Sequence, residues 1–336
     1  MTAATALSAQ TWTAAVDLLS RVGQATLVCH VAPDGDALGS MLGLARVLRA
    51  RGLDVTCTWG DARWSVPSTY RWLPDIDLVV HPDRVAPDPE LLVVLDTGSR
   101  DRLGVLAPLA DTARHVLVID HHAHNSGLSG VQLVDTSAAA TALIVTELVE
   151  RLHGALDAET ATLLYVGVVT DTGSFQHSVT TPEVHLIASR LLAAGAQPDG
   201  VAQQLWGSRP FGYVQVLAAA LERVRLEPDA ASGRGLVWTW TTQDDLDAAG
   251  IGIEEIEPVI DVIRSTQEAD VAAIFKQDVD RSFRVSTRSR GGTDVGAACA
   301  ALGGGGHKLA AGFTAHSSVD ETAELLRAAL EEAPSP

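Results

Sequence analysis

The sequence predicts an α/β protein, with a doubly wound parallel sheet in its N-terminal domain and a smaller α/β domain at its C-terminal end. Short apolar runs rich in β-branched residues alternate with segments of helical apolar spacing, which is the pattern of βαβ units. Two breaks that contain proline or glycine, at 197–200 and 208–210, precede a second group of strands and helices. We therefore expect an N-terminal domain, a linker and a C-terminal domain at residues 1–194, 195–222 and 223–332.

The elements of the first domain follow from the period of the apolar residues. We expect Thr136 and Ser137 to cap the helix that begins near residue 138. The stretch 62–90 contains many prolines and has no clear period. In chain order the expected elements are helix 9–22, strand 26–31, helix 37–50, strand 55–59, strand 91–95, a short helix near 102–112, strand 115–119, helix 138–153 and helix 183–194.

The run 160–170 fits two structures. Its β-branched residues favour a strand, whereas its length and the preceding Asp157-Ala158-Glu159 favour a helix. The second domain is simpler to assign. Its expected elements are strand 235–241, helices near 243–248 and 254–265, strands 270–276 and 282–290, a glycine loop at 303–306 and a closing helix 319–332.

Composition excludes several classes of protein. The 336 residues are 46% hydrophobic and 20% charged, as in a globular protein with a substantial core. A net charge of −18 disfavours general affinity for long nucleic acid. The three cysteines have no C-x-x-C spacing, so a structural zinc site or a disulfide framework is not expected. There is no evident signal peptide and no apolar run that could span a bilayer, so we expect a cytoplasmic enzyme with no membrane partner.

Acidic and histidine side chains follow four of the apolar runs. The strongest case is Asp120-His121-His122, directly after the buried strand 115–119. In open α/β sheets the carboxyl ends of the strands form the ligand site. A single Asp after a strand is most often a cap or turn residue, but several such groups are costly to bury separately. The candidate ligands that the four segments supply are His30, Asp34, Asp36, Asp96, His121 and Asp171.

These residue types favour a pair of divalent cations. Carboxylate and imidazole ligands suit Mn²⁺, Fe²⁺, Zn²⁺ or Mg²⁺. The four carboxylates would repel one another strongly unless cations balanced their charge. Asp34 and Asp36 lie two residues apart, so each could bind a different ion, and Asp96 could bridge the two. Such a pair is suited to hydrolysis of phosphoesters. No G-x-S-x-G sequence occurs, which disfavours an α/β-hydrolase.

The motifs resemble those of the DHH phosphoesterase superfamily. They are the segment from His30 to Ser40, Asp96, Asp120-His121-His122 and Asp171-Thr172-Gly173. The C-terminal run from Gly303 to His307, followed by Ala310-Ala311-Gly312-Phe313, is similar to the glycine–histidine motif of DHHA1 domains. The resemblance covers nearly the whole chain. In size and domain order the chain looks most like the NrnA-type members, which are bifunctional oligoribonucleases (nanoRNases) and pAp phosphatases.

The resemblance implies a role for each matched residue. His30, Asp34, Asp96 and Asp171 would hold one metal ion, and Asp36, Asp96, His121 and Asp171 the other. The ions would most simply be Mn²⁺, with Mg²⁺ or Co²⁺ as substitutes. His122 would face the scissile phosphate as a catalytic residue. Asp120 would orient the site without binding a metal ion itself. The resemblance also implies that the run before Asp171 is a helix.

The C-terminal domain is expected to bind the substrate. Arg284, Ser286 and Arg288 alternate along one predicted strand, so they would share a face with Arg290. Arginine matches phosphate geometry, although such a face is also common on ordinary solvated strands. The glycines would let backbone N–H groups approach a phosphate or base closely. The expected substrate-binding residues are Arg284, Arg288, Arg290, Gly304, Gly305, Gly306 and His307.

The predicted activity is hydrolysis of short oligonucleotides, such as the dinucleotide pApA, to mononucleotides, and removal of the 3′-phosphate of pAp. A cleft between the domains would be a usual place for such a ligand. The alternatives within the superfamily are a pyrophosphatase or polyphosphatase and a RecJ-like exonuclease. A nucleotide-binding regulator without catalysis is the alternative from another class. A homodimer is compatible with the sequence.

Overall fold

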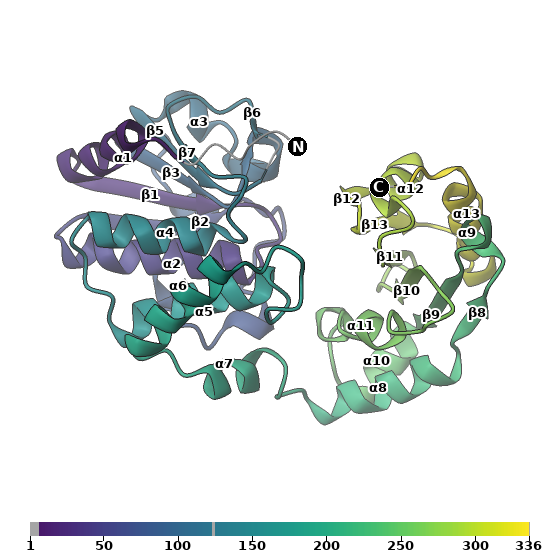
Figure 1. The fold of residues 1–336 in the computed structure, drawn as a ribbon. Coiled ribbons are helices and arrows are strands. Elements are labelled where there is room, and N and C mark those ends of the chain that lie inside the picture. Colours follow the sequence, from purple (N-terminus) through teal and green to yellow (C-terminus); the bar gives the residue numbers. More distant parts are fainter. Residues whose placement is uncertain (1–6, 123–124, 336) are drawn as a thin grey trace. The chain divides into compact units, whose positions relative to one another are not determined.

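In a computed structural model, which describes residues 7–122 and 125–335, the chain divides into two compact units, Met1–Gly207 and Ser208–Pro336. The first unit is built on a parallel sheet with strand order β2-β1-β3-β5-β7, which confirms the predicted doubly wound fold (Figure 1). A short pair, β4 and β6, lies outside that sheet. The strands are β1 (Gln24–Cys29), β2 (Asp54–Trp59), β3 (Leu91–Leu95), β4 (Gly98–Ser99), β5 (His115–Asp120), β6 (Asn125–Ser126) and β7 (Val131–Val134).

Helices cover both faces of this sheet. Alternate strand residues such as Leu27 and Val93 pack in a large core with α1, α2, α4 and α5, whereas Val28 and Val94 pack on the opposite face under η4 and α3. Figure 1 shows α2, α4 and α5 on one side of the sheet and α3 on the other. The helices are α1 (Ala9–Arg21), α2 (Gly35–Ala50), α3 (Leu109–Thr112), α4 (Thr141–Arg151), α5 (Ala158–Asp171), α6 (Pro182–Ala193) and α7 (Pro198–Leu205), with 3₁₀ turns η1 (Ser68–Tyr70), η2 (Ile76–Leu78), η3 (Pro82–Arg84) and η4 (Arg100–Leu106).

The ambiguous run 160–170 is a helix, α5, despite its β-branched residues. It is apolar on nearly all sides, and a helix of that kind must be buried. Glycines bring α2 and α5 close together: a Cβ at Gly39 would lie 2.3 Å from the carbonyl oxygen of Leu163. A Cβ at Gly167 would lie 2.6 Å from Oδ1 of Asp36. This close packing places the C-terminal end of α5 beside the N-terminal end of α2.

Some local predictions for the first unit are wrong. The fifth strand, β7, was not among the expected elements; it pairs with β5 from Leu117–Val131 to Asp120–Val134. The expected helix 102–112 is a 3₁₀ turn, η4, followed by the single turn of α3. Thr136 and Ser137 do not cap α4, whose N-cap is Ala140 without a side-chain bond. The side chain that satisfies this helix end comes from another element, Asp36.

The second unit contains a mixed sheet with strand order β12-β13-β11-β10-β9-β8. Only β9 and β10 pair in parallel; every other pair in this sheet is antiparallel. Its strands are β8 (Arg225–Glu227), β9 (Leu236–Thr241), β10 (Val271–Gln277), β11 (Phe283–Ser289), β12 (Gly305–His307) and β13 (Ala310–Ala315). Its helices are α8 (Phe211–Glu222), α9 (Ala230–Gly233), α10 (Gln243–Ala249), α11 (Val259–Ile263), α12 (Val295–Ala301) and α13 (Val319–Glu332), with the 3₁₀ turn η5 (Ile253–Ile256).

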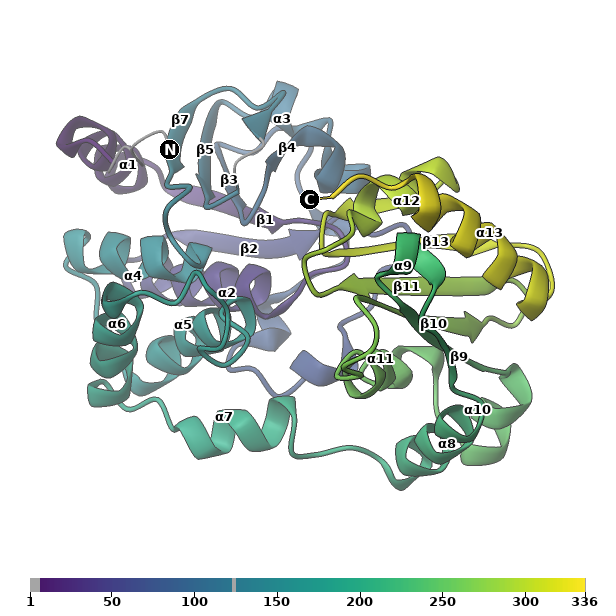
Figure 2. The same ribbon diagram turned by 45° about the vertical axis from the view of Figure 1, so that its right-hand side comes forward.

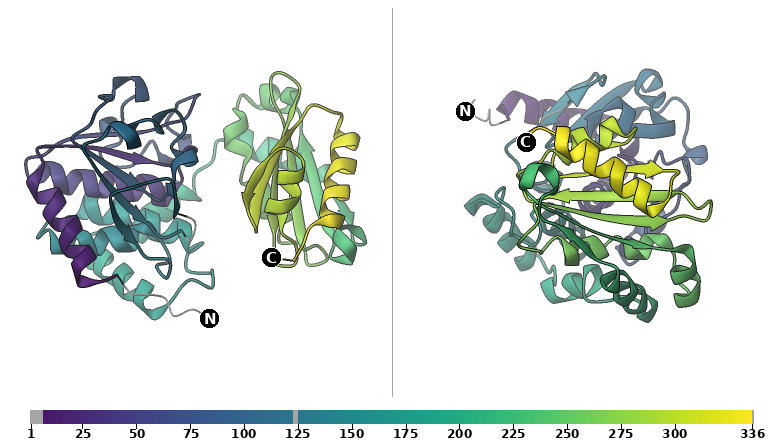
Figure 3. Two further views of the ribbon diagram at one scale, coloured as in Figure 1. Left: turned by 90° about the horizontal axis from the view of Figure 1, so that it is seen from above. Right: turned by 90° about the vertical axis from the view of Figure 1, so that its right-hand side faces the viewer.

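The two faces of this second sheet are covered unequally. One face packs against α9, α12 and α13 along all four central strands, from Trp238 to Phe313. Figure 3 shows the C-terminal helix α13, in yellow, running across it. The other face packs against α8, α10 and α11, and its core takes strand residues from β9 and β10, such as Val237 and Ile274. Within residues 7–122 and 125–335, no helix is long and apolar enough to cross a bilayer.

Candidate active site

The candidate ligands lie where three strands of the first sheet end. His30 follows β1, Asp96 follows β3, and Asp120 is the last residue of β5, with His121 next. Since β1 pairs with β2 on one side and with β3 on the other, the order of the strands reverses direction between β1 and β3. Loops diverge at such a point, which is where α/β sheets bind ligands.

One group of side chains gathers around His30. Its Nε2 lies 3.3 Å from Oδ2 of Asp96 and 3.8 Å from Oδ2 of Asp34. Asp34 is also the N-cap of α2, where its Oδ1 accepts from the N–H groups of Asp36 and Ala37. One oxygen of Asp34 therefore caps the helix, and the other faces His30. These three residues have ligand atoms close enough together to hold a metal ion.

A second group gathers around His121. Its Nε2 lies 3.1 Å from Oδ2 of Asp171, the last residue of α5, and 3.5 Å from Oδ1 of Asp96. Asp36, His121 and Asp171 form another set whose atoms could hold a metal ion. The two groups thus meet at Asp96, because its Oδ2 faces His30 and its Oδ1 faces His121. Asp171 falls in the second group alone.

The backbone at Asp96 is strained. Its φ of 61° lies in the left-handed region, which a residue other than glycine enters at a cost of about 1–3 kcal/mol. The N–H of Asp96 donates to the carbonyl of Ile119 on β5, and the hydroxyl of Thr141 donates to its Oδ1 at 2.8 Å. These two bonds fix the turn and the carboxylate together. The strain therefore serves to aim both oxygens of Asp96 at the two groups.

The residues that hold Asp36 in place were not predicted as site residues from the sequence. Asp36 accepts from the N–H groups of Thr141 and Ala142 at 2.6 and 2.9 Å, and from the hydroxyl of Ser40 at 3.1 Å. Its carboxylate thus lies at the N-terminal end of α4, where the helix dipole favours a negative charge. Gly167 leaves room for it. The glycines at 35, 39 and 43, spaced four residues apart, were the one available signal of this close packing.

Burial and mutual repulsion raise the pKa values of acids at this centre. Burial, together with the charges of Asp36 and Asp34, raises the pKa of Asp171 to about 7. Burial and the neighbouring carboxylates also raise the pKa of Asp96 well above its ordinary value. Burial works to lower the pKa of His121, but Asp171, Asp36 and Asp96 outweigh it and raise that pKa to about 10. Without a cation, this centre therefore binds protons.

The orientation of the two histidine rings indicates which kind of ion the centre binds. Nδ1 of His121 lies 3.2 Å from the carbonyl of Ala138, and Nδ1 of His30 lies 2.8 Å from the carbonyl of Val31. A carbonyl only accepts, so each Nδ1 carries a proton, and each Nε2 faces carboxylate oxygens, where either a second proton or a metal ion can bind. Among the described residues, Nε2 of His121 is buried and has no hydrogen-bond partner. An imidazole nitrogen and a carboxylate oxygen that face each other need a proton or a cation between them, so the residues fit a divalent metal that replaces the proton.

His122 is held differently from His121. Its Nδ1 lies 2.7 Å from Oδ1 of Asp120, which also accepts from the backbone N–H of His122 at 3.1 Å. Asp120 is fully buried, so the imidazole is held by a carboxylate that solvent does not reach. Nδ1 of His122 also lies 3.8 Å from Oδ1 of Asp96, and geometry alone would admit His122 to a metal-binding set with Asp96 and His121.

The predicted arginines of the second unit are already paired. In β11, Phe283, Val285 and Thr287 are buried, so Arg284 and Arg288 share the other face, as the alternation predicts. Nε of Arg284 lies 3.0 Å from Oδ2 of Asp278, and Nη2 of Arg288 lies 3.2 Å from Oε1 of Glu257. The strand is shorter than expected and ends at Ser289, so Arg290 lies beyond it. Nη1 of Arg290 donates to the carbonyls of Thr266 and Gln267.

The glycine loop is partly a hairpin. Residues 305–307 form β12, which pairs with β13, and residues 303–307 are exposed. A Cβ at Gly304 would lie 2.1 Å from the carbonyl of Gly312, and Gly306 has φ of 145°. The fold itself therefore requires these two glycines. Gly305 has neither a positive φ nor an atom within 4 Å of an added Cβ, so neither its backbone conformation nor a close contact requires a glycine there.

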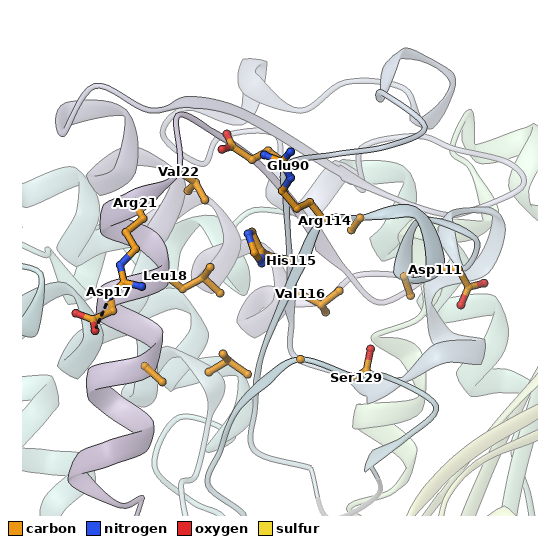
Figure 4. Close-up of a pocket in the computed structure, with 15 residues that line it drawn as sticks. Asp17, Leu18, Arg21, Val22, Glu90, Asp111, Arg114, His115, Val116 and Ser129 are labelled. Carbon is orange, nitrogen blue, oxygen red and sulfur yellow. Dashed lines mark hydrogen bonds and ion pairs between the residues drawn. The ribbon is translucent and has the colours of Figure 1, made fainter.

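A groove of about 980 Å³ lies at the other edge of the first sheet (Figure 4). It includes His115 and Val116 at the start of β5, and therefore lies away from Asp120 at the end of that strand. Its acids are engaged elsewhere: Asp17 pairs with Arg21, and Glu90 accepts from the N–H groups of residues 23 and 24. It offers no metal-binding set among the described residues.

Both units match known families. Residues 24–168 match the DHH family, N-terminal domain, and residues 247–333 match the DHHA1 domain. A curated relative from Thermus thermophilus, a bifunctional oligoribonuclease and PAP phosphatase NrnA, is 35% identical over 294 residues, which cover 87% of this chain and 84% of the relative. The protein of the same name from Bacillus subtilis is 26% identical over 86% of this chain and 88% of its own length.

Solved structures share the fold. An exopolyphosphatase-related protein from Bacteroides fragilis superposes with a TM-score of 0.88 at 21% identity, covering 97% of this chain and 96% of its own. The exonuclease RecJ bound to manganese superposes with a TM-score of 0.58 at 17% identity, covering 98% of this chain and 97% of its own. At these identities the likeness concerns the arrangement of the elements alone.

Proposed function

The chain belongs to the DHH family, and from that premise we propose that it hydrolyses short oligonucleotides such as pApA to mononucleotides and removes the 3′-phosphate of pAp. The relatives from Thermus thermophilus and Bacillus subtilis, which match over most of its length, carry both activities in their names. The observation that carries the proposal is the pair of metal-binding sets that meet at Asp96. A regulator without catalysis would have no need for such a centre.

We assign two divalent cations, Mn²⁺ first among them, to the two sets. His30 and Asp34 would hold one, Asp36, His121 and Asp171 the other, and Asp96 would contact both. When bound, such a pair neutralises charge on the phosphoryl group and lowers the pKa of the attacking water. Ser40 and Thr141 hold Asp36 and Asp96 in position, and the carbonyls of Val31 and Ala138 fix the two imidazoles.

His122 and Asp120 complete the chemistry. Asp120 holds Nδ1 of His122, so the imidazole keeps one orientation and one tautomer. We assign Nε2 of His122 to the scissile phosphate. There the ring, protonated on both nitrogens, would give its Nε2 proton to the leaving oxygen and be left with the Nδ1–H that Asp120 holds. Arg284 and Arg288 would anchor the rest of the nucleotide together with the loop at Gly305.

The test compares substrates on one metal-stripped preparation with Mn²⁺, Mg²⁺ or Co²⁺ restored. We expect release of AMP from pApA and of phosphate from pAp with Mn²⁺, and none in excess EDTA. Degradation of long single-stranded DNA at a similar rate would support a RecJ-like exonuclease instead. Preference for pyrophosphate would support a pyrophosphatase. Nucleotide binding without any hydrolysis would leave the regulator as the correct assignment.

A further inference from the structure

Lys276 is a buried cation on the sheet of the second unit. It is 8% exposed and follows the five apolar residues that begin β10. Its Nζ contacts Oε2 of Glu257 and donates to the hydroxyl of Ser286 at 2.9 Å. The other oxygen of Glu257, Oε1, accepts from Arg288 at 3.2 Å. One carboxylate therefore lies between two cations that come from neighbouring strands.

The sheet beside this cluster carries small side chains and no hydrophobic core among the described residues. Ser286 and Arg288 lie opposite Ile274 and Ala272 in the register of β10 and β11, so they point to the face that α8 and α11 cover. The hydrophobic core on that face contains no described residue of β11, β12 or β13. The partners of Ser286 and Arg288 on β13 are Gly312 and Ala310, which are small. All four of these residues are partly exposed, so a ligand can reach the sheet beside the cations.

The carboxylate of Glu257 lies between two cations, where an anionic ligand would lie. It follows η5 and precedes Pro258, with φ −52° and ψ −40°, a helical conformation that residues before proline disfavour. Its side chain is 41% exposed, although it pairs with a nearly buried lysine. Burial works to raise its pKa, but Lys276 and Arg288 outweigh that effect and hold the pKa below its ordinary value. The carboxylate is thus an ionised pair of oxygens held by a lysine and an arginine, as a phosphate would be.

We propose that Glu257 is a built-in competitor for a phosphate of the substrate, occupying the place between Lys276 and Arg288 that this phosphate takes. Lys276 is then a substrate-binding residue, and Glu257 sets specificity because only a strongly anionic group displaces it. This inference rests on the proposed function. Both pApA and pAp carry a second phosphate one nucleoside away from the bond that is broken, whereas ApA carries none. The substrate class is therefore short nucleotides with a terminal phosphate.

The experiment measures KM and kcat of Glu257→Gln for pApA and ApA with Mn²⁺. Removal of the competing charge should lower KM for pApA by about threefold or more, because the binding-competent fraction rises. KM for ApA and the rate on bis-p-nitrophenyl phosphate should not change. Glu254→Gln, which removes the same charge from an exposed position on the same turn, is the matched control and should behave as wild type.

An ion pair that only fastens the turn to the sheet predicts the opposite sign. Glu257→Gln would then raise KM for pApA, or raise KM for pApA and ApA alike, and either result overturns the proposal. If Glu257→Gln does not fold, Lys276→Gln decides: a rise in KM for pApA alone supports the proposal, and equal rises for both dinucleotides contradict it. Binding of AMP to the metal-free protein, tighter in Glu257→Gln than in wild type, tests the inference even if wild type hydrolyses none of these substrates.

Discussion

The candidate metal centre of the first unit and the β11 face of the second unit both gather charged side chains, but they balance the charge differently. At the metal centre, acids outnumber cations, and Nε2 of His121 is buried without a hydrogen bond among the described residues. On the β11 face, Arg284 pairs with Asp278 and Arg288 pairs with Glu257. The charges of the metal centre are therefore balanced only when a cation binds. Those of the β11 face are balanced already, and a bound anion would have to replace one of its acids.

The largest effect should come from Asp96→Ala, which removes the carboxylate that the two metal-binding sets share. We expect loss of bound Mn²⁺. Turnover should fall well beyond the roughly 10–100-fold loss that is typical when a residue that hydrogen-bonds to a metal ligand is changed. Metal content by atomic spectroscopy and the rate on pApA measure it. Asp101→Ala, an exposed carboxylate in η4, is the control and should keep both. Near-normal turnover with full Mn²⁺ content would falsify the bridging assignment.

The next effect separates the two adjacent histidines. His122→Ala should keep most of the bound Mn²⁺ and reduce kcat by about 10²–10⁴-fold, the usual contribution of a general acid. His121→Ala should instead lose Mn²⁺, because its Nε2 faces Asp171 and Asp96. If the two variants lose the same amount of metal, His122 is a ligand and not the proton donor.

The unbalanced charge of the metal centre predicts a pH dependence. The pKa of Asp171 is about 7 in the fold against 3.8 ordinarily, and that of His121 is about 10 against 6.5. The native state thus binds more protons than the unfolded chain, so the metal-free protein should lose stability as pH rises over this window. Mn²⁺ replaces those protons, so its addition should raise Tm more at about pH 8 than at about pH 6. At a hundredfold excess over Kd, the bound ion should add about 3 kcal/mol to the free energy of unfolding. A Tm rise that does not grow with pH would place the ion elsewhere.

The smallest effect concerns the balanced region. Arg288→Ala should cost about 1–3 kcal/mol in kcat/KM on pApA, as lost charge-assisted hydrogen bonds do. It should leave the rate on bis-p-nitrophenyl phosphate and the Mn²⁺ content unchanged, and His307→Ala serves as a parallel variant. Equal losses on both substrates would mean that the second unit supports the fold or the metal centre, and not substrate anchoring.

Sequence reasoning succeeded where a local pattern decides the structure. Strand 91–95 and helix 319–332 have the predicted bounds, because an uninterrupted apolar run defines the strand, and an amphipathic pattern with a Ser318–Glu321 capping box defines the helix. The candidate ligands could be named because strand ends are readable from the sequence. The helix 158–171 required the family resemblance, since its β-branched residues favour a strand and only tertiary burial against α2 makes it helical.

The remainder depends on contacts between distant segments. No local signal joins Asp36 to the start of α4, which lies 105 residues later in the chain. Lys276 and Glu257 are likewise unremarkable in the sequence, and the cluster exists only because β10 and β11 pair in one register. Arg288 could be proposed for phosphate binding from the sequence, but its existing ion pair with Glu257 could not be foreseen.

The number of metal ions tests the central claim most directly. Mn²⁺ is titrated into metal-free wild-type protein, with bound Mn²⁺ and hydrolysis of pApA measured on the same samples. Two metal-binding sets that meet at Asp96 predict two ions per chain, with hydrolysis appearing as the second is bound. Full activity with a single bound ion, or saturation at one ion with no activity gained from more, would contradict a two-metal centre.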